Sequence, residues 1–477
     1  MEYIRSNDSK GDFVLKLTVR HEDKEKTEEF AERILLWEAL DKMGFAVGRP
    51  CGGRGVCGNC EVIANGEPVR SCITWLEEDT VVEDLSAETE MQMPPGAVTI
   101  TGQEGLAKEG YGLAVDIGTT TIAGYLYKFP EGELVKEVGM VNPQVKYGAD
   151  VVTRMEYALK GGGENLRECL VEQIKKLAEG FSIEKTVICG NTVMLHFLTG
   201  KSVAGMACAP YVPETLFGEW QENAYLPGCV SAFVGADVVC AVLYSEMWKQ
   251  KVSLLVDIGT NGEMVLYKEG RYICCSAAAG PALEGAEISM GMSAEPGAID
   301  KVYMENGRVK YTTVGGARPQ GICGSGLLDA IAVMLQLGVL DDTGYLEEPY
   351  ELGDSGVNIT PEDVRQVQLA KGAIRAGMET LLQESGCRYA QVERFYIAGG
   401  FGSYLDKENA ATVGLIPREL LEKTVVLGNG AGKGACLLLQ SRAHLEKARE
   451  ITENAATLSL ADSAYFGEKY VEHMMFE

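Results

Sequence analysis

The sequence lacks the features of a membrane-spanning, secreted or histidine-based metal protein. No run of 18 apolar residues occurs in its 477 residues, so we expect no membrane-spanning helix. The first residues, MEYIRSNDSKGDF, contain no apolar stretch typical of a signal peptide. The four histidines, at positions 21, 196, 444 and 473, are too scattered to predict a histidine metal site or a serine–histidine–acid arrangement. These absences favour a cytoplasmic protein.

Positive charge is also scarce. The chain has 43 Lys and Arg against 69 Asp and Glu, a formal net charge of −26. This balance argues against nucleic acid or an anionic membrane as a partner. The hydrophobic fraction of 46% and the charged fraction of 23% are those of an ordinary soluble protein. A chain of 477 residues exceeds what one hydrophobic core usually spans, which predicts two or three domains.

The first 90 residues predict a compact α+β domain. Residues 12–22 are typical of a strand, and residues 27–45 carry apolar side chains at helical spacing. Asn65 and Gly66 indicate a tight hairpin turn between two short strands. Residues 86–110 contain Pro94-Pro95-Gly96 and small polar residues, so we place a linker at 91–110.

Cysteine is concentrated in one loop. Four of the 14 cysteines lie in the 22 residues from 51 to 72, beginning with CGGRGVCGNC. Three thiolates from one tight loop and a fourth from the hairpin suit an iron–sulfur cluster, and the glycines let the loop turn its N–H groups toward the sulfurs. The predicted ligands are Cys51, Cys57, Cys60 and Cys72. Their spacing resembles that of the short-hairpin 2Fe–2S domains at the front of multidomain enzymes.

A structural zinc site and a redox-inert loop are the alternatives for these cysteines, although closed zinc sites usually pair two separate knuckles. The other ten cysteines are expected to be buried small apolar residues. Among them, Cys274 and Cys275 are adjacent and suit a single metal poorly.

The remainder of the chain repeats one strand-turn pattern. LAVDIGTTT at 113–121 matches LLVDIGTNG at 254–262, and each half has a later strand that ends in a glycine turn, at 187–195 and 396–404. Strands alternate with helices throughout, which is typical of α/β layers. Two copies predict duplicated lobes, at 111–250 and 251–477, that face each other across a cleft.

Each repeated turn offers the chemistry of a phosphate site. A glycine after a buried strand lets the following N–H groups and hydroxyls point one way, as in an anion-binding nest. A carboxylate at the strand end, Asp116 or Asp257, can hold magnesium through the waters of that ion. The candidate phosphate-binding residues are Gly118, Thr119, Thr120, Thr121, Gly259, Thr260, Asn261, Gly262 and Glu263.

The body of the chain resembles the superfamily of sugar kinases, heat-shock chaperone ATPases and actin. Its first and second phosphate motifs resemble 116–121 and 257–263, its connecting helices resemble 234–244 and 429–439, and its adenosine motif resembles IAGGFG at 397–402. The resemblance implies a two-lobed, ribonuclease-H-like ATPase. It further implies that Asp237 orients the attacking water, that Asp116 and Asp257 hold Mg²⁺, and that the backbone at Gly399, Gly400 and Gly402 lies against the nucleoside.

Other site residues have competing structural interpretations. A helix N-cap is the alternative interpretation of Asp237. GPALEG at 280–285 could be a plain loop, or it could bring Gly280 and Glu284 to the site. CGSG at 323–326 could simply begin a helix, or the N–H groups at Gly324 and Ser325 could face a phosphate.

The whole chain resembles the reductive activators of corrinoid proteins. Besides the cysteine loop and the phosphate turns, the likeness includes the stretches NPQVKYGADVVTRM at 142–155, GNTVMLHFLTG at 190–200, GPALEGAEI at 280–288 and ICGSGLLDAIA at 322–332. Some relatives carry an extra small domain between the ferredoxin and the ATPase. In this sequence only the linker occupies that place.

The resemblance implies a ferredoxin-like β-grasp domain with a 2Fe–2S cluster, joined to an ATPase that binds ATP and Mg²⁺. It also implies ATP-dependent reduction of Co(II) to Co(I) in the corrinoid protein of an anaerobic methyltransferase system, with an upstream electron donor. Whether the chain forms a homodimer stays open. The alternatives are a kinase or an activator of another low-potential enzyme, and a non-enzymatic, nucleotide-switched redox sensor.

Overall fold

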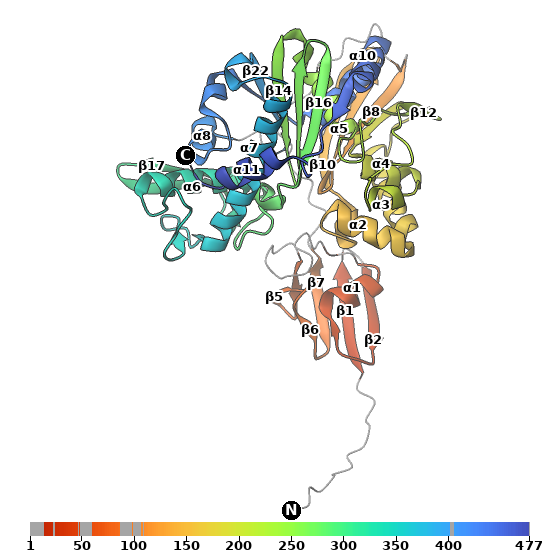
Figure 1. Ribbon diagram of the computed structural model, residues 1–477. Coiled ribbons are helices and arrows are strands. Elements are labelled where there is room, and N and C mark those ends of the chain that lie inside the picture. The colour runs from red at the N-terminus through yellow and green to blue at the C-terminus, as the bar shows by residue number, and fades with distance from the viewer. Residues whose placement is uncertain are drawn as a thin grey trace, which may run out of the picture. The chain divides into compact units, whose positions relative to one another are not determined.

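The computed structural model describes residues 14–21, 24–45, 47, 60–85, 98, 106–107, 109–400 and 405–476. The chain divides into two compact units, Met1–Thr89 and Glu90–Glu477, whose elements are labelled in Figure 1. Among the described residues, no helix combines the length and the apolar character needed to cross a bilayer.

The first unit is a mixed β-sheet with one helix. Its strand order is β2-β1-β7-β4-β5, in which β1 and β7 are parallel and the other neighbours are antiparallel. The elements are β1 (Leu15–His21), β2 (Lys24–Phe30), β3 (Ile34–Leu35), α1 (Leu36–Lys42), β4 (Glu61–Ala64), β5 (Glu67–Arg70), β6 (Trp75–Leu76) and β7 (Thr80–Leu85). This is a β-grasp arrangement, in which the sheet and α1 bury one small core.

The helix predicted over residues 27–45 is wrong in its first half. Residues Lys24–Phe30 form β2, which pairs antiparallel with β1 along its whole length, from Leu15 opposite Phe30 to His21 opposite Lys24. The helix is confined to Leu36–Lys42. Pairing with β1 satisfies the backbone of this charged segment at the edge of the sheet, where its side chains need no core.

The predicted hairpin turn is confirmed. β4 and β5 pair antiparallel with Ala64 opposite Glu67, so the loop consists of Asn65 and Gly66. Their φ angles are +50° and +80°. Positive φ at both loop residues is the conformation that matches the twist of a two-residue hairpin, and an Asn-Gly pair adopts it readily. The turn therefore fixes the register of the two strands that carry the cysteines at their bases.

The described residues of the predicted linker belong to the second unit and contact other residues of it. The amide of Leu106 donates to the carbonyl of Leu439 at 2.9 Å. The hydroxyl of Tyr127 donates to the carbonyl of Val98, also at 2.9 Å, and Ala107 is buried. These contacts attach the end of the linker to Tyr127 and Leu439 of the second unit.

The first lobe of the second unit is built on a six-stranded sheet with the order β10-β9-β8-β11-β13-β12. β8, β9 and β10 form an antiparallel meander, whereas β11 is parallel to β8 and β13 is parallel to β11. The strands are β8 (Gly110–Ile117), β9 (Thr121–Phe129), β10 (Glu133–Val141), β11 (Ile183–Gly190), β12 (Glu219–Gln221) and β13 (Ala224–Leu226). The helices are α2 (Val151–Tyr157), α3 (Gly163–Leu177), α4 (Thr192–Thr199) and α5 (Ala236–Ser245).

The second lobe repeats this plan in a sheet with the order β23-β22-β14-β15-β16-β24. β14, β15 and β16 form the meander, and β22 and β23 follow in parallel on the other side of β14. The strands are β14 (Val252–Ile258), β15 (Gly262–Lys268), β16 (Arg271–Ala277), β22 (Arg394–Ala398), β23 (Thr424–Gly428) and β24 (Ala455–Thr457). The duplication predicted from the repeated strand-turn pattern is therefore confirmed.

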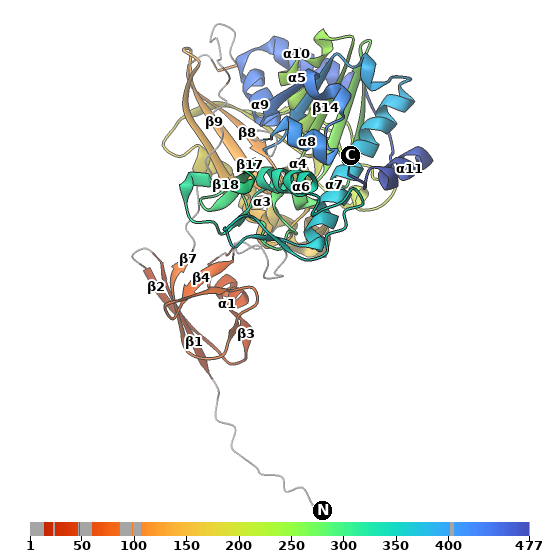
Figure 2. The ribbon, with the colours of Figure 1, turned by 90° about the vertical axis from the view of Figure 1, so that its left-hand side faces the viewer.

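The second lobe also carries smaller sheets and further helices. β17 (Ala298–Glu305) joins β18 (Arg308–Thr313) and β19 (Gly321–Ile322), and β20 (Tyr350–Glu351) pairs with β21 (Asn358–Ile359). Helix α6 (Gly324–Leu337) packs on β17, as Figure 2 shows. The remaining helices are α7 (Pro361–Glu384), α8 (Lys407–Val413), α9 (Gly430–Gln440), α10 (Arg442–Glu453) and α11 (Ala464–Glu472).

Helices α5 and α9 connect the two lobes through a close backbone contact. A Cβ atom placed on Gly434 of α9 would lie 2.0 Å from the carbonyl oxygen of Cys240 on α5. Only glycine permits this approach. The two helices belong to a core that includes the first lobe and also Leu255 and Val265 of the second. Figure 1 shows α5 between the strands of the two sheets.

Helix α11 is held on α7 by a small charge network around Glu379. His473 Nε2 lies 2.9 Å from Glu379 Oε1, and Lys469 Nζ lies 3.7 Å from Glu379 Oε2. Arg375 on α7 lies 3.8 Å from the same carboxylate. Burial opposes ionisation of Glu379, but the hydrogen bond and charge of His473, with Arg375 and Lys469, hold its pKa below the usual value.

We expect Glu379→Gln to lower the free energy of unfolding by about 1–3 kcal/mol at pH 7, because charge-assisted contacts are lost. A lowered pKa in the folded state means that the stabilisation is present above the pKa of the unfolded chain, about 4.3, and disappears as the pH falls through the lower folded value. Chemical denaturation of both proteins between pH 3 and 7 measures the difference.

Glu472→Gln is the matched control, because Glu472 contacts the same Lys469 at 2.6 Å but is largely exposed. It should change the stability by less than about 0.5 kcal/mol. If the deficit of Glu379→Gln were the same at pH 3 as at pH 7, the charge network would not be its cause.

Candidate functional site

Two of the four predicted cluster ligands lie side by side in the first unit. Cys60 precedes β4 and Cys72 follows β5, so both thiols sit at the base of the hairpin, where Glu61 pairs with Arg70. Their Sγ atoms are 3.1 Å apart, and neither forms a disulfide. Both cysteines are buried in the core of the unit. Ser71 fixes this geometry, because its amide and hydroxyl both donate to the carbonyl of Cys60.

A pair of buried, reduced thiols pointing together fits thiolate ligation of an iron–sulfur cluster. Cys51 and Cys57 lie outside the described residues, as does the glycine-rich loop between them. Their roles stay predictions, and the hairpin half of the site is the part that the structure supports.

In the second unit, the two repeated strands end in equivalent environments. Asp116 on β8 is opposite Cys189 on β11, and Asp257 on β14 is opposite Ala398 on β22. The residue after Cys189 is Gly190, and the residue after Ala398 is Gly399. Each glycine comes close to the strand opposite it, β8 or β14. A Cβ atom on Gly190 would lie 2.7 Å from the carbonyl oxygen of Ile117, and one on Gly399 would lie 2.4 Å from that of Ile258.

Both turns after these strands leave amides available to a ligand. In the first turn the amide of Gly118 donates to the carbonyl of Thr121, and in the second the amide of Gly259 donates to that of Asn261. Among the described residues, the amides of Thr119, Thr120, Thr260 and Asn261 meet no acceptor. Free amides that follow a buried strand are the equipment of a phosphate nest.

Carboxyl groups from both lobes influence one another at this site. Burial raises the pKa of Asp116 to about 6, against hydrogen bonds from Asn429 and Cys189 that favour the charged form. Burial, followed by the charge of Asp116, raises the pKa of Asp237 to about 7. The pKa of Asp257 rises to about 8, first through burial and then through the negative charges of Asp237 and Asp116.

Two glutamates extend this acidic group. Burial and the charges of Asp237 and Asp257 raise the pKa of Glu263, which pairs across the sheet with Asp257 and lies 3.4 Å from the hydroxyl of Ser276. Burial also raises the pKa of Glu284, although its hydrogen bond from Thr260 favours ionisation. A cation would relieve the repulsion in such a group.

The arrangement suits a magnesium ion that keeps its waters. Within the described ranges, no three Asp, Glu, Cys or His side chains are grouped closely enough to hold a metal directly. Mg²⁺ usually retains several waters and binds through one or two carboxylates together with phosphate oxygens. Asp116 and Asp257, from opposite lobes, fit that role.

Asp237 is not the N-cap of its helix. Helix α5 begins at Ala236, and Gly235 is its N-cap. Asp237 lies in the first turn, where Oδ1 accepts from the amide of Val238 at 2.8 Å. A Cβ atom on Gly235 would lie 2.5 Å from Cα of Asn191 and 2.7 Å from Asp237 Oδ1. The glycine thus allows the start of α5 to approach the end of β11, which brings Asp237 toward Asp116.

Glu284 lies beside the second phosphate turn. It ends a short 3-10 turn, Pro281–Glu284, that follows Gly280. Glu284 Oε2 accepts from the hydroxyl of Thr260 at 2.7 Å, and a Cβ atom on Gly259 would lie 3.4 Å from Oε1. The prediction that GPALEG brings Glu284 to the site agrees with this contact.

The remaining candidates have different surroundings. Gly324 and Ser325 are buried in the first turn of α6, where the hydroxyl of Ser325 donates to the carbonyl of Asp300 at 3.0 Å. Gly400 lies two residues after the end of β22, and a Cβ atom added there would meet no atom of the described residues within 4 Å. Gly402 lies outside the described residues. For Gly324 and Ser325 a structural role at the helix start is the one with contacts to support it.

Sequence reasoning did not assign three asparagines that contact the site. Asn429 caps α9 and hydrogen-bonds Asp116. Asn142 donates to the carbonyl of Gly118 at 2.8 Å, and Asn191 donates to the hydroxyl of Thr119 at 3.3 Å. Asn142 and Asn191 lie in the stretches 142–155 and 190–200, which resemble the corrinoid-protein activators but not ordinary kinases. That resemblance was the one sequence signal that could have pointed to these two residues. Their partners are distant in sequence, so no local pattern gave their roles.

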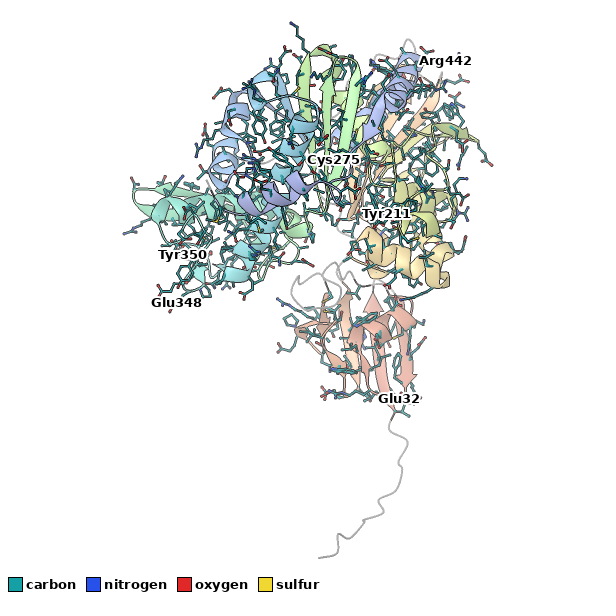
Figure 3. All side chains as sticks on the ribbon, viewed as in Figure 1. Glu32, Tyr211, Cys275, Glu348, Tyr350 and Arg442 are labelled. Atoms are coloured by element: carbon teal, nitrogen blue, oxygen red, sulfur yellow. The ribbon has the colours of Figure 1, made fainter. Side chains whose placement is uncertain are left out.

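The structural interpretations of Cys274, Cys275 and His196 are confirmed. Of the ten cysteines outside the predicted cluster site, eight are buried as expected, but Cys169 is only partly buried and Cys208 is exposed. Cys274 belongs to the core of the first lobe and Cys275 to that of the second. Because adjacent strand residues face opposite sides of a sheet, the two thiols cannot share a metal. Cys275 is labelled within the sheet in Figure 3. His196 is a core histidine, fully buried, with Nδ1 2.7 Å from the carbonyl oxygen of Thr192.

Comparison with known proteins gives a consistent result along the chain. A model of the C-terminal domain of RACo, the ASKHA domain, matches residues 251–477, and a model of the RACo middle region matches residues 111–250. A solved structure of a reductive activator for corrinoid,iron-sulfur protein has a TM-score of 0.70 and 27% sequence identity. The match covers 97% of this chain and 98% of that one.

Two curated relatives share much of the sequence. The corrinoid activation enzyme RamQ of Eubacterium limosum is 34% identical over 422 residues, which are 77% of this chain and 70% of that protein. The [Co(II) methylated amine-specific corrinoid protein] reductase of Methanosarcina barkeri is 29% identical over 414 residues, 76% of each protein.

We expect Gly399→Ala to weaken MgATP binding by tenfold or more, as measured by isothermal titration calorimetry. Gly399 has a φ of +99°, and a Cβ atom there would lie 2.4 Å from the carbonyl oxygen of Ile258 and 2.8 Å from Asp257 Oδ1. Something must move, and the carboxylate that would face the metal is among the displaced atoms.

Gly386→Ala is the matched control, because Gly386 also has a positive φ, +61°, but no atom within 4 Å of the added Cβ. It should show the cost of the backbone conformation, about 1 kcal/mol of stability, without loss of ATP affinity. Equal ATP affinity in the two variants would refute the proposed importance of Gly399.

Proposed function

The chain belongs to the RACo family of reductive activators of corrinoid proteins, and we propose that it uses ATP to return the inactive Co(II) of a corrinoid protein to Co(I). The partner would be the corrinoid protein of a methyltransferase system in an anaerobic cytoplasm, and an upstream protein would supply the electron. The observation that carries this proposal is the presence, in one chain, of a buried thiol pair and of two equivalent strand ends whose following turns leave amides unpaired.

The first unit would hold the electron. Cys60 and Cys72 would provide two ligands of a 2Fe–2S cluster, together with Cys51 and Cys57. Such a cluster, when bound, supplies a one-electron carrier. Each 59 mV of unfavourable potential difference lowers the equilibrium constant tenfold for one electron. A gap of a few hundred millivolts between cluster and cobalt would therefore leave very little Co(I) unless another free-energy source is coupled.

The second unit would provide that source by binding and hydrolysing ATP. The free amides of the two turns would face the phosphate oxygens, and Asp116 and Asp257 would hold the waters of Mg²⁺. Asp237 would orient and deprotonate the attacking water. Its pKa of about 7 suits a general base near neutral pH.

Closure of the lobes would couple ATP to the cobalt. Phosphate contacts would come from both lobes, so a bound nucleotide would favour the arrangement in which the two turns approach each other. In this proposal the lobes would pivot about the close contact between Gly434 of α9 and Cys240 of α5. Movement of a lobe that grips the corrinoid protein would change the ligation of cobalt, which raises its potential toward that of the donor.

No observation favours a kinase or a redox sensor. A small-molecule kinase needs no buried thiol pair, and a sensor that only switches conformation needs no base beside its phosphate turns.

The central prediction is that Co(I) forms only with ATP. Anaerobic protein, a chemical reductant and a Co(II) corrinoid protein are mixed, and the absorption of Co(I) is followed with and without MgATP. The same rate and extent of Co(I) formation without ATP would end the proposal.

Two variants should separate the electron and ATP functions. Cys72→Ser should abolish Co(I) formation and the electron-spin signal of the reduced cluster, while ATP hydrolysis in the presence of the corrinoid protein continues. Asp237→Asn should keep the cluster signal and reduce the ATP hydrolysis rate by about 10²–10⁴-fold.

Cys208→Ser is the control for the cysteine change, because Cys208 is exposed and lies in the other unit. It should behave as the wild type in both assays. A Cys72→Ser protein that still produces Co(I) would show that the electron does not pass through this thiol pair.

A further inference from the structure

The duplicated phosphate turns differ in the direction of their threonine hydrogen bonds. Thr119 and Thr260 occupy the same position of the Asp-Ile-Gly-Thr repeat. Asn191 Nδ2 donates to Thr119 Oγ1 at 3.3 Å, so this hydroxyl oxygen is an acceptor. Thr260 Oγ1 instead donates to Glu284 Oε2 at 2.7 Å. The two lobes therefore present hydroxyl groups of opposite polarity.

The orientation of the Asn191 amide is fixed by the backbone. Asn191 is the N-cap of α4, and its Oδ1 accepts from the amide of Met194 at 2.9 Å. The oxygen is committed to the helix, so the NH₂ group must face Thr119. Because Thr119 accepts this bond, its own proton remains available, and no acceptor for it exists among the described residues.

The backbone of the first turn is oriented in the same sense. Asn142 is fully buried. Its side-chain Nδ2 donates to the carbonyl of Gly118, and its backbone N–H donates to the carbonyl of Thr120, each at 2.8 Å. Its Oδ1 accepts from the amide of Gln144, which fixes this side chain as well. Asn142 binds the carbonyls of Gly118 and Thr120, whereas the amides of Thr119 and Thr120 stay unpaired.

The second turn has no equivalent support in the part of the chain that the structure describes. Its carbonyls at Gly259 and Thr260 accept no asparagine amide. The hydroxyl proton of Thr260 is directed to Glu284. The groups that remain for a ligand are therefore the oxygen lone pairs of Thr260 and Glu284. Lone pairs suit a hydrated cation or a water molecule rather than an anion.

We infer that Asn191 is a positioning residue that makes the Thr119 hydroxyl a donor to a nucleotide phosphate, so that the first turn recognises phosphate with a side-chain hydroxyl as well as with its amides. The second turn, whose amides at Thr260 and Asn261 would still face phosphate, differs in that the side-chain oxygens of Thr260 and Glu284 are left for the metal and its waters. This assignment rests on the proposed ATP-binding function and adds a division of labour between the two copies of one motif.

Asn191→Asp tests the inference with an isosteric change. The aspartate still accepts from the amide of Met194 and caps α4 as well as asparagine does, so the fold should persist. Its second oxygen can no longer donate to Thr119. It instead accepts a hydrogen bond from the threonine hydroxyl, and it adds a negative charge beside the phosphates. Asn191→Ser keeps a capping oxygen but removes the donor without adding charge.

Asn165→Asp on α3 is the matched control. Asn165 Nδ2 donates to an exposed hydroxyl, that of Tyr157, at 2.7 Å, so the substitution makes the same chemical change in the same lobe on the surface. MgATP affinity is measured by isothermal titration calorimetry on the full chain with its cluster, and thermal unfolding is recorded for each variant.

We expect Asn191→Asp to weaken MgATP binding at least tenfold and Asn191→Ser a few-fold, with unfolding temperatures within about 2 °C of the wild type because both caps persist. Asn165→Asp should bind within twofold of the wild type. The inference is overturned if Asn191→Asp binds MgATP as Asn165→Asp does. It is also overturned if the two Asn191 variants lose affinity equally and only together with thermal stability, since that is a folding defect. A wild-type protein without affinity for MgATP would instead refute the proposed function.

Discussion

The nucleotide-binding unit depends on one close contact between helices. Gly434 of α9 lies against the carbonyl of Cys240 on α5, and a single methyl group would not fit between them. The contact brings the two ends of the duplicated fold into one shared core. Asp237 begins α5 and Asn429 precedes α9, so the same pair of helices also delivers a carboxylate and an amide toward Asp116. A change in the helix crossing would move those groups relative to the strand ends.

Crowding of like charge is the second organising feature. Burial raises the pKa of Asp116, Asp237 and Asp257. The charge of Asp116 adds to the rise at Asp237, and the charges of Asp237 and Asp116 add to the rise at Asp257, which is the largest of the three. The protein tolerates this repulsion at the place where strands of both lobes end. A site with this property binds a nucleotide together with its metal far better than the nucleotide alone, because the cation offsets charge on both partners.

Much of this organisation could be predicted from local sequence. The Asp-Ile-Gly-Thr repeat indicated two equivalent strand ends, and Asn65-Gly66 indicated the hairpin that brings Cys60 and Cys72 together. The failures share a cause. Residues 27–30 were predicted to begin a helix, but they belong to β2, where pairing with an antiparallel partner outweighs a weak helical period. Asn191 and Asn142 look like ordinary capping residues, because their functional contacts are with residues more than 20 positions away.

The hairpin geometry has a consequence for handling the protein. Two reduced sulfurs 3.1 Å apart need to approach by only about 1 Å to form a bond of the usual disulfide length. If these thiols ligate a cluster as proposed, exposure to air before the iron is inserted would oxidise both of them in one event. Maturation of the first unit would depend on a thiol reductant as much as on a supply of iron and sulfide.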